Sequence, residues 1–285
     1  MAPAQSYVER LPVAPLDDLV RTVWVQRVGE DPYVQRNVPT GGVELQCPVG
    51  SLPRLVGPLT GPSVDVLAPG TTVVGVRFRP GAAGAVLGLP ASELVDLTVG
   101  LDEIWGPEAA VLGELIGGAR SADVVLRLLQ EHLVGRRGDG IRRDPLVSEA
   151  VRWLMPWRAG GVRSLSSRLA ISPSQLRRRC LTAVGIGPKA LQRTLRFQGF
   201  LALAQSTGMR SRSQDGGGGG GLAWLAAQAG YADHAHLSRE CVRMTGLAPR
   251  AFLGDGTGLC DCGHDHAASF RPFLRGRRSG VGPSA

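Results

Sequence analysis

Two short segments near the end of the chain carry the same pattern of polar and apolar residues. Residues 172–188 read SPSQLRRRCLTAVGIGP, and residues 233–249 read DHAHLSRECVRMTGLAP. An offset of 61 positions aligns Leu176 with Leu237, Arg178 with Arg239, Cys180 with Cys241, Gly185 with Gly246 and Pro188 with Pro249. Arginines in such positions can recognise DNA, because a guanidinium donates two parallel hydrogen bonds to guanine in the major groove. Two such units in one basic region predict paired helix-turn-helix modules.

Each copy has the features of a helix that presents its N-terminal end to a ligand. Ser172 and Pro173 supply an N-cap and a proline at the first helical position, and Asp233 can cap the second copy. Leu176 and Cys180 are four positions apart and are expected to face the core. We expect the exposed N-terminal positions to contact bases: Ser174, Gln175, Arg177 and Arg178 in the first helix, and His234, Ala235, Ser238 and Arg239 in the second.

The surrounding sequence supplies elements that must position these helices. Residues 145–157 and 164–170 are expected to form helices ahead of the first copy, and residues 222–230 ahead of the second. Residues 188–206 have apolar positions at helical spacing and predict a linking helix. Residues 211–221, which end in six consecutive glycines, are expected to form a flexible loop between that helix and the second unit.

The net charge of the chain is +8, and it is unevenly distributed. Residues 1–140 hold 11 arginines and 16 acidic residues, whereas residues 141–285 hold 20 arginines, one lysine and 8 acidic residues. This imbalance favours phosphate backbones as a partner of the second half, the alternative being a solvated arginine-rich surface. The sequence has no signal-peptide pattern and no apolar run long enough to span a bilayer, and its five scattered cysteines fit a reducing compartment. We therefore expect a cytoplasmic protein without a membrane partner.

The first half of the chain is expected to be rich in β-strands. Between residues 19 and 78, Val- and Leu-rich segments are cut by proline or glycine, with a spacing of about ten residues that favours a small barrel or sandwich. Helical segments follow as far as residue 133. The expected fold class is α+β in two domains. Residues 1–134 form a β-rich domain with trailing helices, residues 135–144 a linker, residues 145–253 an all-α domain and residues 254–285 a disordered tail.

The second half resembles the DNA-binding domain of the AraC/XylS family of bacterial transcription regulators. The resemblance covers residues 146–253 and rests on Ser172-Pro173-x-x-Leu176-x-Arg178, Gly185-x-x-Pro188, Ala226-x-x-x-Gly230-Tyr231, Leu237-Ser238-Arg239 and Gly246-Leu247-x-Pro249. It implies that two helix-turn-helix units of one monomer enter successive major grooves of double-stranded promoter DNA, and that the protein contacts RNA polymerase. The sequence departs from the family at Cys180 and Cys241, where phenylalanine is usual, at Ser166, and at the polyglycine insertion.

The first half resembles an uncharacterised β-rich domain that precedes such DNA-binding domains in actinobacterial regulators. The motifs that carry this resemblance are Trp24-Val25, Pro39-x-Gly41-Gly42-Val43-Glu44-Leu45, Gly57-Pro58, Gly75-Val76-Arg77-Phe78-Arg79-Pro80-Gly81-Ala82 and Leu87-Gly88-Leu89. The resemblance implies a domain that senses a small-molecule effector or forms a homodimer, and it names no ligand. Many relatives have a cupin-like barrel there, but a metal cupin enzyme needs clustered histidines, and this half contains only His132. We expect neither catalysis nor a cofactor.

Two alternative functions stay open. A DNA-repair or adaptive-response enzyme with an appended DNA-binding module would need a reactive cysteine, and Cys47 lies in the acidic half without an obvious activator. The polyglycine insertion also allows an interaction protein with a decayed DNA-binding half. Cys180 and Cys241 could sense redox state, but their inward positions favour inert packing. The tail segment Cys260-Asp261-Cys262-Gly263-His264-Asp265-His266 is dense in metal ligands, although its spacing is unlike that of structural zinc sites.

Overall fold

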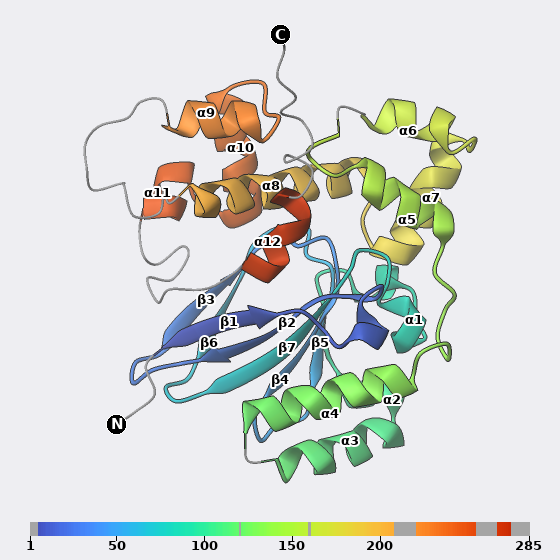
Figure 1. Ribbon diagram of the computed structural model, residues 1–285, viewed down its shortest axis with the longest axis vertical. Coiled ribbons are helices and arrows are strands. Elements are labelled where there is room, and N and C mark those ends of the chain that lie inside the picture. Colours follow the sequence, from blue (N-terminus) through green and yellow to red (C-terminus); the bar gives the residue numbers. More distant parts are fainter. Residues whose placement is uncertain (1–4, 120, 159–160, 208–220, 255–266, 275–285) are drawn as a thin grey trace.

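The chain folds into a strand-rich N-terminal domain and an all-helical C-terminal domain (Figure 1), as seen in a computed structural model. The structure describes residues 5–119, 121–158, 161–207, 221–254 and 267–274. Its strands are β1 (Ser6–Arg10), β2 (Val20–Arg27), β3 (Tyr33–Asn37), β4 (Glu44–Pro48), β5 (Arg54–Val56), β6 (Ser63–Leu67), β7 (Thr72–Phe78) and β8 (Thr98–Gly100). The predicted two-domain α+β fold class is confirmed.

The strands form one large sheet and one small ribbon. Six strands pair antiparallel in the order β1-β2-β7-β4-β5-β8, and β3 pairs with β6 in a separate two-stranded ribbon. Trp24 of β2 lies opposite Gly75 of β7, and a β-carbon at Gly75 would overlap the Trp24 indole. The glycine therefore lets this large ring lie flat across the neighbouring strand.

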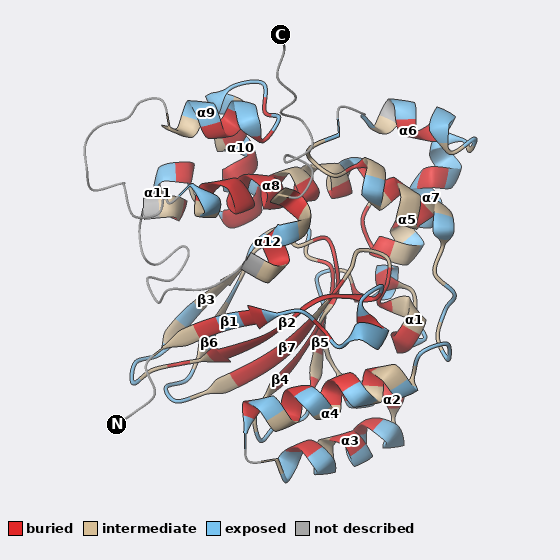
Figure 2. Cartoon of the chain, in the orientation of Figure 1, coloured by how far each residue is buried: buried red, intermediate tan, exposed pale blue. Residues whose placement is uncertain are grey.

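One face of the six-stranded sheet is apolar and is covered by the helices that follow it. Because side chains alternate along a strand, Val74, Val76 and Phe78 of β7 all point to this face and are buried. The covering elements are two 3-10 helices, η1 (Ala14–Leu16) and η2 (Ala91–Leu94), and the helices α1 (Gly84–Leu87), α2 (Leu101–Trp105), α3 (Pro107–Gly117) and α4 (Ala122–Gly135). The buried stripes of α4 and of the strands face one another in Figure 2.

The C-terminal domain is built around one long central helix. Its helices are α5 (Pro145–Trp153), α6 (Val162–Arg168), α7 (Pro173–Val184), α8 (Pro188–Ser206), α9 (Gly221–Gln228), α10 (His234–Thr245) and α11 (Pro249–Gly254). Phe197 and Phe200 of α8 are fully buried, and Phe197 packs against Phe252 of α11. Cys180 and Cys241 are buried in the same core, where they act as small apolar residues.

The second face of the sheet is polar, and the C-terminal domain covers it. An antiparallel sheet with one packed face commonly leaves the other to solvent. Here Tyr7, Glu9, Trp24 and Gln26 on this face are buried. A cavity of about 120 Å³ is lined by Tyr7, Trp24 and Gln26 together with α8, the later helix α12 (Ala267–Leu274) and the β3–β6 ribbon. The polar face is therefore the contact surface between the two domains.

The prediction of a disordered tail is wrong for residues 267–274, which form the helix α12 (Ala267–Leu274). This helix lies between α8 and the edge of the sheet formed by β1 and β2 (Figure 1). It is ordered because it buries apolar surface, with Phe270 and Phe273 both part of the C-terminal core. Residues 255–266 and 275–285 of the predicted tail lie outside the described residues, as do most of the polyglycine residues.

Candidate nucleic-acid interface

Helix α7 begins and ends at strong local signals. The Ser172 hydroxyl accepts a hydrogen bond from the Gln175 backbone N–H at 3.2 Å, and the Gln175 side-chain oxygen accepts one from the Ser172 N–H at 3.1 Å. This reciprocal capping box fixes the first turn. Gly185 ends the helix with a left-handed φ of 84°. Leu176 and Cys180 are buried beneath the helix, so the opposite face is presented outward.

Helix α10 repeats this construction in the second unit. The Asp233 carboxylate accepts a hydrogen bond from the His236 N–H at 2.6 Å, and Gly246 closes the helix with φ 77°. Leu237 and Cys241 are buried, as Leu176 and Cys180 are in α7. The repeat in the sequence is therefore a repeat of two capped helices, each with one buried face.

The residues predicted to contact bases lie on the outward faces of these two helices. Those on α7 are exposed, and those on α10 are exposed except for half-buried Ser238. The full set is Ser174, Gln175, Arg177, Arg178, His234, Ala235, Ser238 and Arg239. Spacings of three and four place Ser174, Arg177 and Arg178 on one face. Gln175 differs from them because its side-chain oxygen is engaged in the helix cap.

The arginines of the two helices divide into paired and unpaired ones. Arg179 forms an ion pair with Asp144 at 2.6 Å, and Arg243 lies 3.4 Å from Glu240. Within the described part of the chain, no side chain pairs with the guanidinium of Arg177, Arg178 or Arg239. The outward faces therefore offer donors that no described side chain occupies and that are available to phosphates and bases.

The long helix α8 packs against helices of both units. Twelve of its 19 residues are buried, among them Leu191 and Phe200. At 1.5 Å per residue its length is about 28 Å, which is close to the 34 Å or so of one turn of B-DNA. The length of α8 is therefore comparable to one helical turn of DNA.

The N-terminal domain touches the C-terminal end of both outward-facing helices. Gly185 after α7 packs so closely against Pro58, Val95 and Ala91 that a β-carbon there would lie 2.8 to 3.0 Å from each. Arg36 of β3 donates a hydrogen bond to the Thr245 carbonyl at the end of α10, at 3.0 Å. The domain thus contacts both units at equivalent places.

Comparison with known families now adds to this geometry. Residues 165–255 match a family described as a helix-turn-helix domain, and residues 8–100 match a domain of unknown function (DUF6597). The C-terminal domain is a helix-turn-helix domain of the AraC type. This match supports a DNA-binding transcription regulator. No protein of curated function matches the chain.

Solved structures of ToxT from Vibrio cholerae align with most of this regulator. A 1.65 Å structure has 13% sequence identity and a TM-score of 0.45, over 87% of this chain and 98% of ToxT. The structure of an apo variant of ToxT has 14% sequence identity and a TM-score of 0.44, over 81% of this chain and 96% of ToxT. The structure of ToxT with a bound unsaturated fatty acid has 13% sequence identity and a TM-score of 0.42, over 90% of this chain and 96% of ToxT. Similarity at this level is too low to carry function from one protein to the other.

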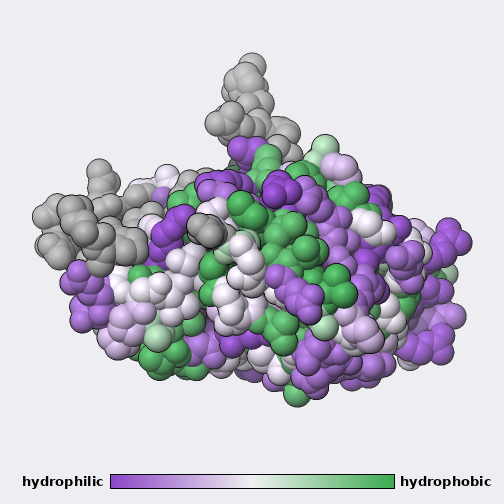
Figure 3. All heavy atoms as spheres, turned by 90° about the horizontal axis from the view of Figure 1, so that it is seen from below, coloured by the Kyte–Doolittle hydropathy of each residue, from purple (hydrophilic) through white to green (hydrophobic). Residues whose placement is uncertain are grey.

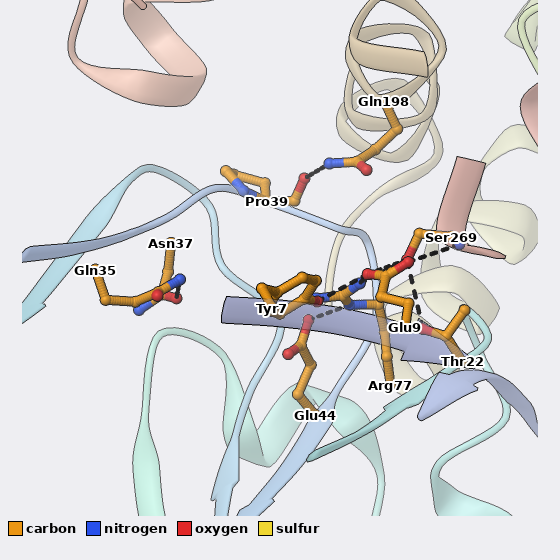
Figure 4. Close-up of polar contacts among 10 residues, drawn as sticks. All are labelled: Tyr7, Glu9, Thr22, Gln35, Asn37, Pro39, Glu44, Arg77, Gln198 and Ser269. Carbon is orange, nitrogen blue, oxygen red and sulfur yellow. Dashed lines mark hydrogen bonds and ion pairs between the residues drawn. The ribbon is translucent and has the colours of Figure 1, made fainter. Parts of the chain in front are cut away.

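A buried polar cluster joins α12 to the N-terminal sheet (Figure 4). Arg77 donates to the Glu9 carboxylate at 2.7 Å and to the Glu44 carboxylate at 2.6 Å. Ser269 of α12 approaches from the other side, and both its backbone N–H and its hydroxyl donate to Glu9 at 2.8 Å. Burial raises the pKa of the Tyr7 hydroxyl well above its ordinary value, so Tyr7 remains a donor to Glu9.

Sequence reasoning did not identify this cluster. Its polar residues alternate with apolar ones along the strands, as residues of a solvated face also do. The contact between Ser269 and Glu9 joins positions 260 residues apart, and no local pattern encodes such a pairing. The spacing of Phe270, Phe273 and Leu274 in the tail was the available signal, because it marks one apolar side of a short helix.

Neither a metal site nor a membrane-spanning helix is found in the part of the chain that the structure describes. It contains no group of three or more histidine, cysteine, aspartate or glutamate side chains that could hold a metal ion. The ligand-rich segment 260–266 lies outside the described residues. Among the described helices, each is too short or too polar to cross a bilayer.

The three cysteines within the described ranges are expected to resist alkylation in the native protein. Burial raises the pKa of Cys47 to about 12 and those of Cys180 and Cys241 to about 11. At about pH 8, only about one molecule in a thousand therefore has the reactive thiolate form at Cys180, and the same holds for Cys241. Iodoacetamide labelling resolved by mass spectrometry should modify them only after denaturation in guanidinium chloride. Fast native labelling of Cys180 or Cys241 would instead favour redox sensing.

Proposed function

We propose that this regulator reads two successive major grooves of promoter DNA with α7 and α10, under control of its N-terminal domain. The observation that carries the proposal is the pair of capped helices with matching outward arginines, Arg178 and Arg239, which have no side-chain partner among the described residues. In the first groove, Ser174 and Arg177 contact bases next to those contacted by Arg178. In the second groove, His234, Ala235 and Ser238 contact bases next to those contacted by Arg239. Gln175 has the smaller role, because its side-chain oxygen caps α7.

The position of η2 beside α7 provides a way to control DNA binding. Ser92 of η2 lines one shallow hollow together with Ser174, Arg177 and Arg178 of α7. A helix with its side chains is about 10–12 Å across, and the major groove is about 12 Å wide. The groove therefore has no room for both α7 and η2, so η2 must move aside before α7 inserts. A ligand that favours one domain arrangement over the other would change DNA affinity.

The remaining parts of the proposal concern assembly and partners. Helix α3 exposes Val111 and Leu115, which are 59% and 56% accessible and four positions apart. Figure 3 views the molecule from this side and shows apolar surface gathered on it. This face supports a homodimer through the N-terminal domains, which sedimentation velocity can test.

The regulator acts in the cytoplasm, where it contacts RNA polymerase at the promoter, and it catalyses no reaction.

The alternative of a repair enzyme loses its main candidate residue. Such an enzyme needs an exposed cysteine with a depressed pKa. Cys47 is fully buried in the sheet core, and burial raises its pKa to about 12. This setting favours a packing role for Cys47 and counts against Cys47 as a catalytic nucleophile.

A binding selection tests the proposed function. Purified protein is mixed with fragments of its source genome at near-physiological salt, and the bound fragments are sequenced. We expect a few upstream regions with two short boxes about one helical turn apart. One enriched box would mean that only one unit engages DNA. Uniform, salt-sensitive retention would contradict sequence-specific regulation, because it is the mark of nonspecific phosphate attraction.

A further inference from the structure

Two apolar side chains lie at equivalent positions on the outward sides of α7 and α10. Leu181 and Val242 are related by the same offset of 61 positions that aligns the two helices. Val242 is 48% exposed although its side chain is apolar, and Leu181 is half-buried. A single exposed apolar residue is ordinary on a protein surface. Two of them at matching positions of a repeated interface indicate a common role.

Both residues continue the stripe of side chains that carries the reading arginine. On α10 this stripe has the spacing i, i+3, i+4 and i+7, and it consists of Ala235, Ser238, Arg239 and Val242. The stripe on α7 has the same spacing and ends at Leu181. The recognition helix of a homeodomain reads the major groove from four positions with this spacing. The last position of each stripe is therefore within reach of the bases.

The chemistry of an apolar side chain limits which base it can face. Each base pair presents hydrogen-bonding groups in the major groove, and thymine alone adds a methyl group. The Val242 side chain has no donor or acceptor, so an amino or carbonyl group that it covered would lose its hydrogen bond to water. Covering a methyl group instead removes apolar surface of both partners from water. Thymine is therefore the base that this position favours.

The helix geometry places this thymine close to the base that the arginine contacts. Val242 lies three residues beyond Arg239, which is about 4.5 Å along the helix axis. Successive base pairs are about 3.4 Å apart, so the two side chains reach bases within about two base pairs of each other. Arg178 and Leu181 have the same separation on α7. Since guanine is the base that suits arginine best, each box should contain a guanine with a thymine nearby.

The docked N-terminal domain partly covers one of the two side chains. Leu181 lines the hollow that Ser92 of η2 lines from the other side, and η2 packs along α7. When η2 moves aside, the apolar surface of Leu181 loses this cover. A thymine methyl group in the major groove would cover it again. Leu181 thus has an apolar neighbour in the docked arrangement and gains another in the DNA complex.

We propose that Leu181 and Val242 each pack against the 5-methyl group of a thymine, one in each box of the site. Each thymine lies within about two base pairs of the guanine contacted by the arginine of the same helix. The assignment rests on the proposed function and deepens it, because it states part of the DNA sequence that each unit selects.

Replacing thymine by uracil tests the assignment, because uracil lacks only the methyl group. The duplex found by the binding selection is synthesised with uracil at that thymine, in one box at a time, and its Kd is measured by fluorescence anisotropy at fixed salt. The wild-type protein should bind each substituted duplex about three- to fivefold more weakly, as expected for one buried methyl group. This measurement uses the unaltered protein, so it does not depend on the folding of a variant.

Two variants then assign each methyl group to one side chain. Leu181→Ala should bind without sensitivity to uracil in one box and keep the full loss in the other, and Val242→Ala should show the reverse. Each variant is thereby the control for the other. Val66→Ala is a further control, because Val66 is a 68% exposed valine on β6, outside both helices. It should show the wild-type losses in both boxes.

The outcomes separate this assignment from the proposed function. A selection without any shared box would contradict the proposed function, and the assignment would fall with it. Shared boxes without a thymine near the guanine, or wild-type binding that is indifferent to uracil, would overturn the assignment alone. A full loss in both boxes for Leu181→Ala or Val242→Ala would overturn the role of that side chain.

Discussion

Replacing Arg178 and Arg239 together by alanine is expected to lower affinity for the selected DNA site by roughly a hundredfold or more. Each arginine that reads a guanine contributes about 1–3 kcal/mol of discrimination, and the two lie in separate units whose effects should add. Both side chains are exposed and have no ion-pair partner within the described ranges, so the fold should be retained. Fluorescence anisotropy with a labelled duplex at fixed salt measures the loss.

A second pair of arginines in the same two helices provides the control. Arg179 pairs with Asp144, and Arg243 pairs with Glu240. The variant Arg179→Ala/Arg243→Ala removes the same charge but leaves the outward faces intact, so it should weaken specific binding only a few-fold. Equal losses for the two double variants would mean that charge alone determines binding, and the assignment of the reading residues would then be wrong.

The two capped helices could be predicted because their signals are local. Ser172 with Pro173 starts α7 and Asp233 starts α10, within one residue of where the sequence places them. Leu176 and Cys180 are buried as their spacing requires. Capping and amphipathic spacing act over a single turn or two of helix, so they can be inferred without knowledge of the rest of the fold.

The strand pairing and the domain contact could not be predicted in the same way. β2 pairs with β7, which lies 45 residues or more further along the chain, and no turn joins the two strands. Trp24 and Gln26 belong to an alternating strand pattern that fits a solvated face equally well. Only the docking of α8 and α12 makes that face buried, and this depends on contacts such as that of Gln198 with the Pro39 carbonyl.

The second large effect concerns α12. Ser269→Asp is expected to detach this helix from the sheet, because it removes the hydroxyl that donates to Glu9 and sets a second carboxylate against it. The Glu9 side chain is fully buried, and two like charges at such a site cannot both be ionised without a large cost. Disrupting one side of a buried ionic cluster costs about 3–5 kcal/mol. This is comparable to the roughly 3–6 kcal/mol that burial of Phe270 and Phe273 contributes, so little is left to offset the entropy of ordering the helix.

Chymotrypsin cleavage measures the detachment directly. Phe270 and Phe273 are buried while α12 is docked, so cleavage after them should become at least about tenfold faster in Ser269→Asp. Ser279→Asp is the control, since it places the same residue outside α12. Equal cleavage rates in the two variants would show that the contact with Glu9 does not hold the helix.

Detachment of α12 should also raise DNA affinity. The helix contacts Glu9 of the sheet on one side and packs its phenylalanines into the core of the DNA-binding domain on the other. Its release weakens the docking that keeps η2 beside α7, so we expect the selected duplex to bind about three- to tenfold more tightly. Faster cleavage with unchanged DNA affinity would limit α12 to a structural role. Faster cleavage with tighter binding would make the C-terminal helix part of the mechanism that controls access to α7.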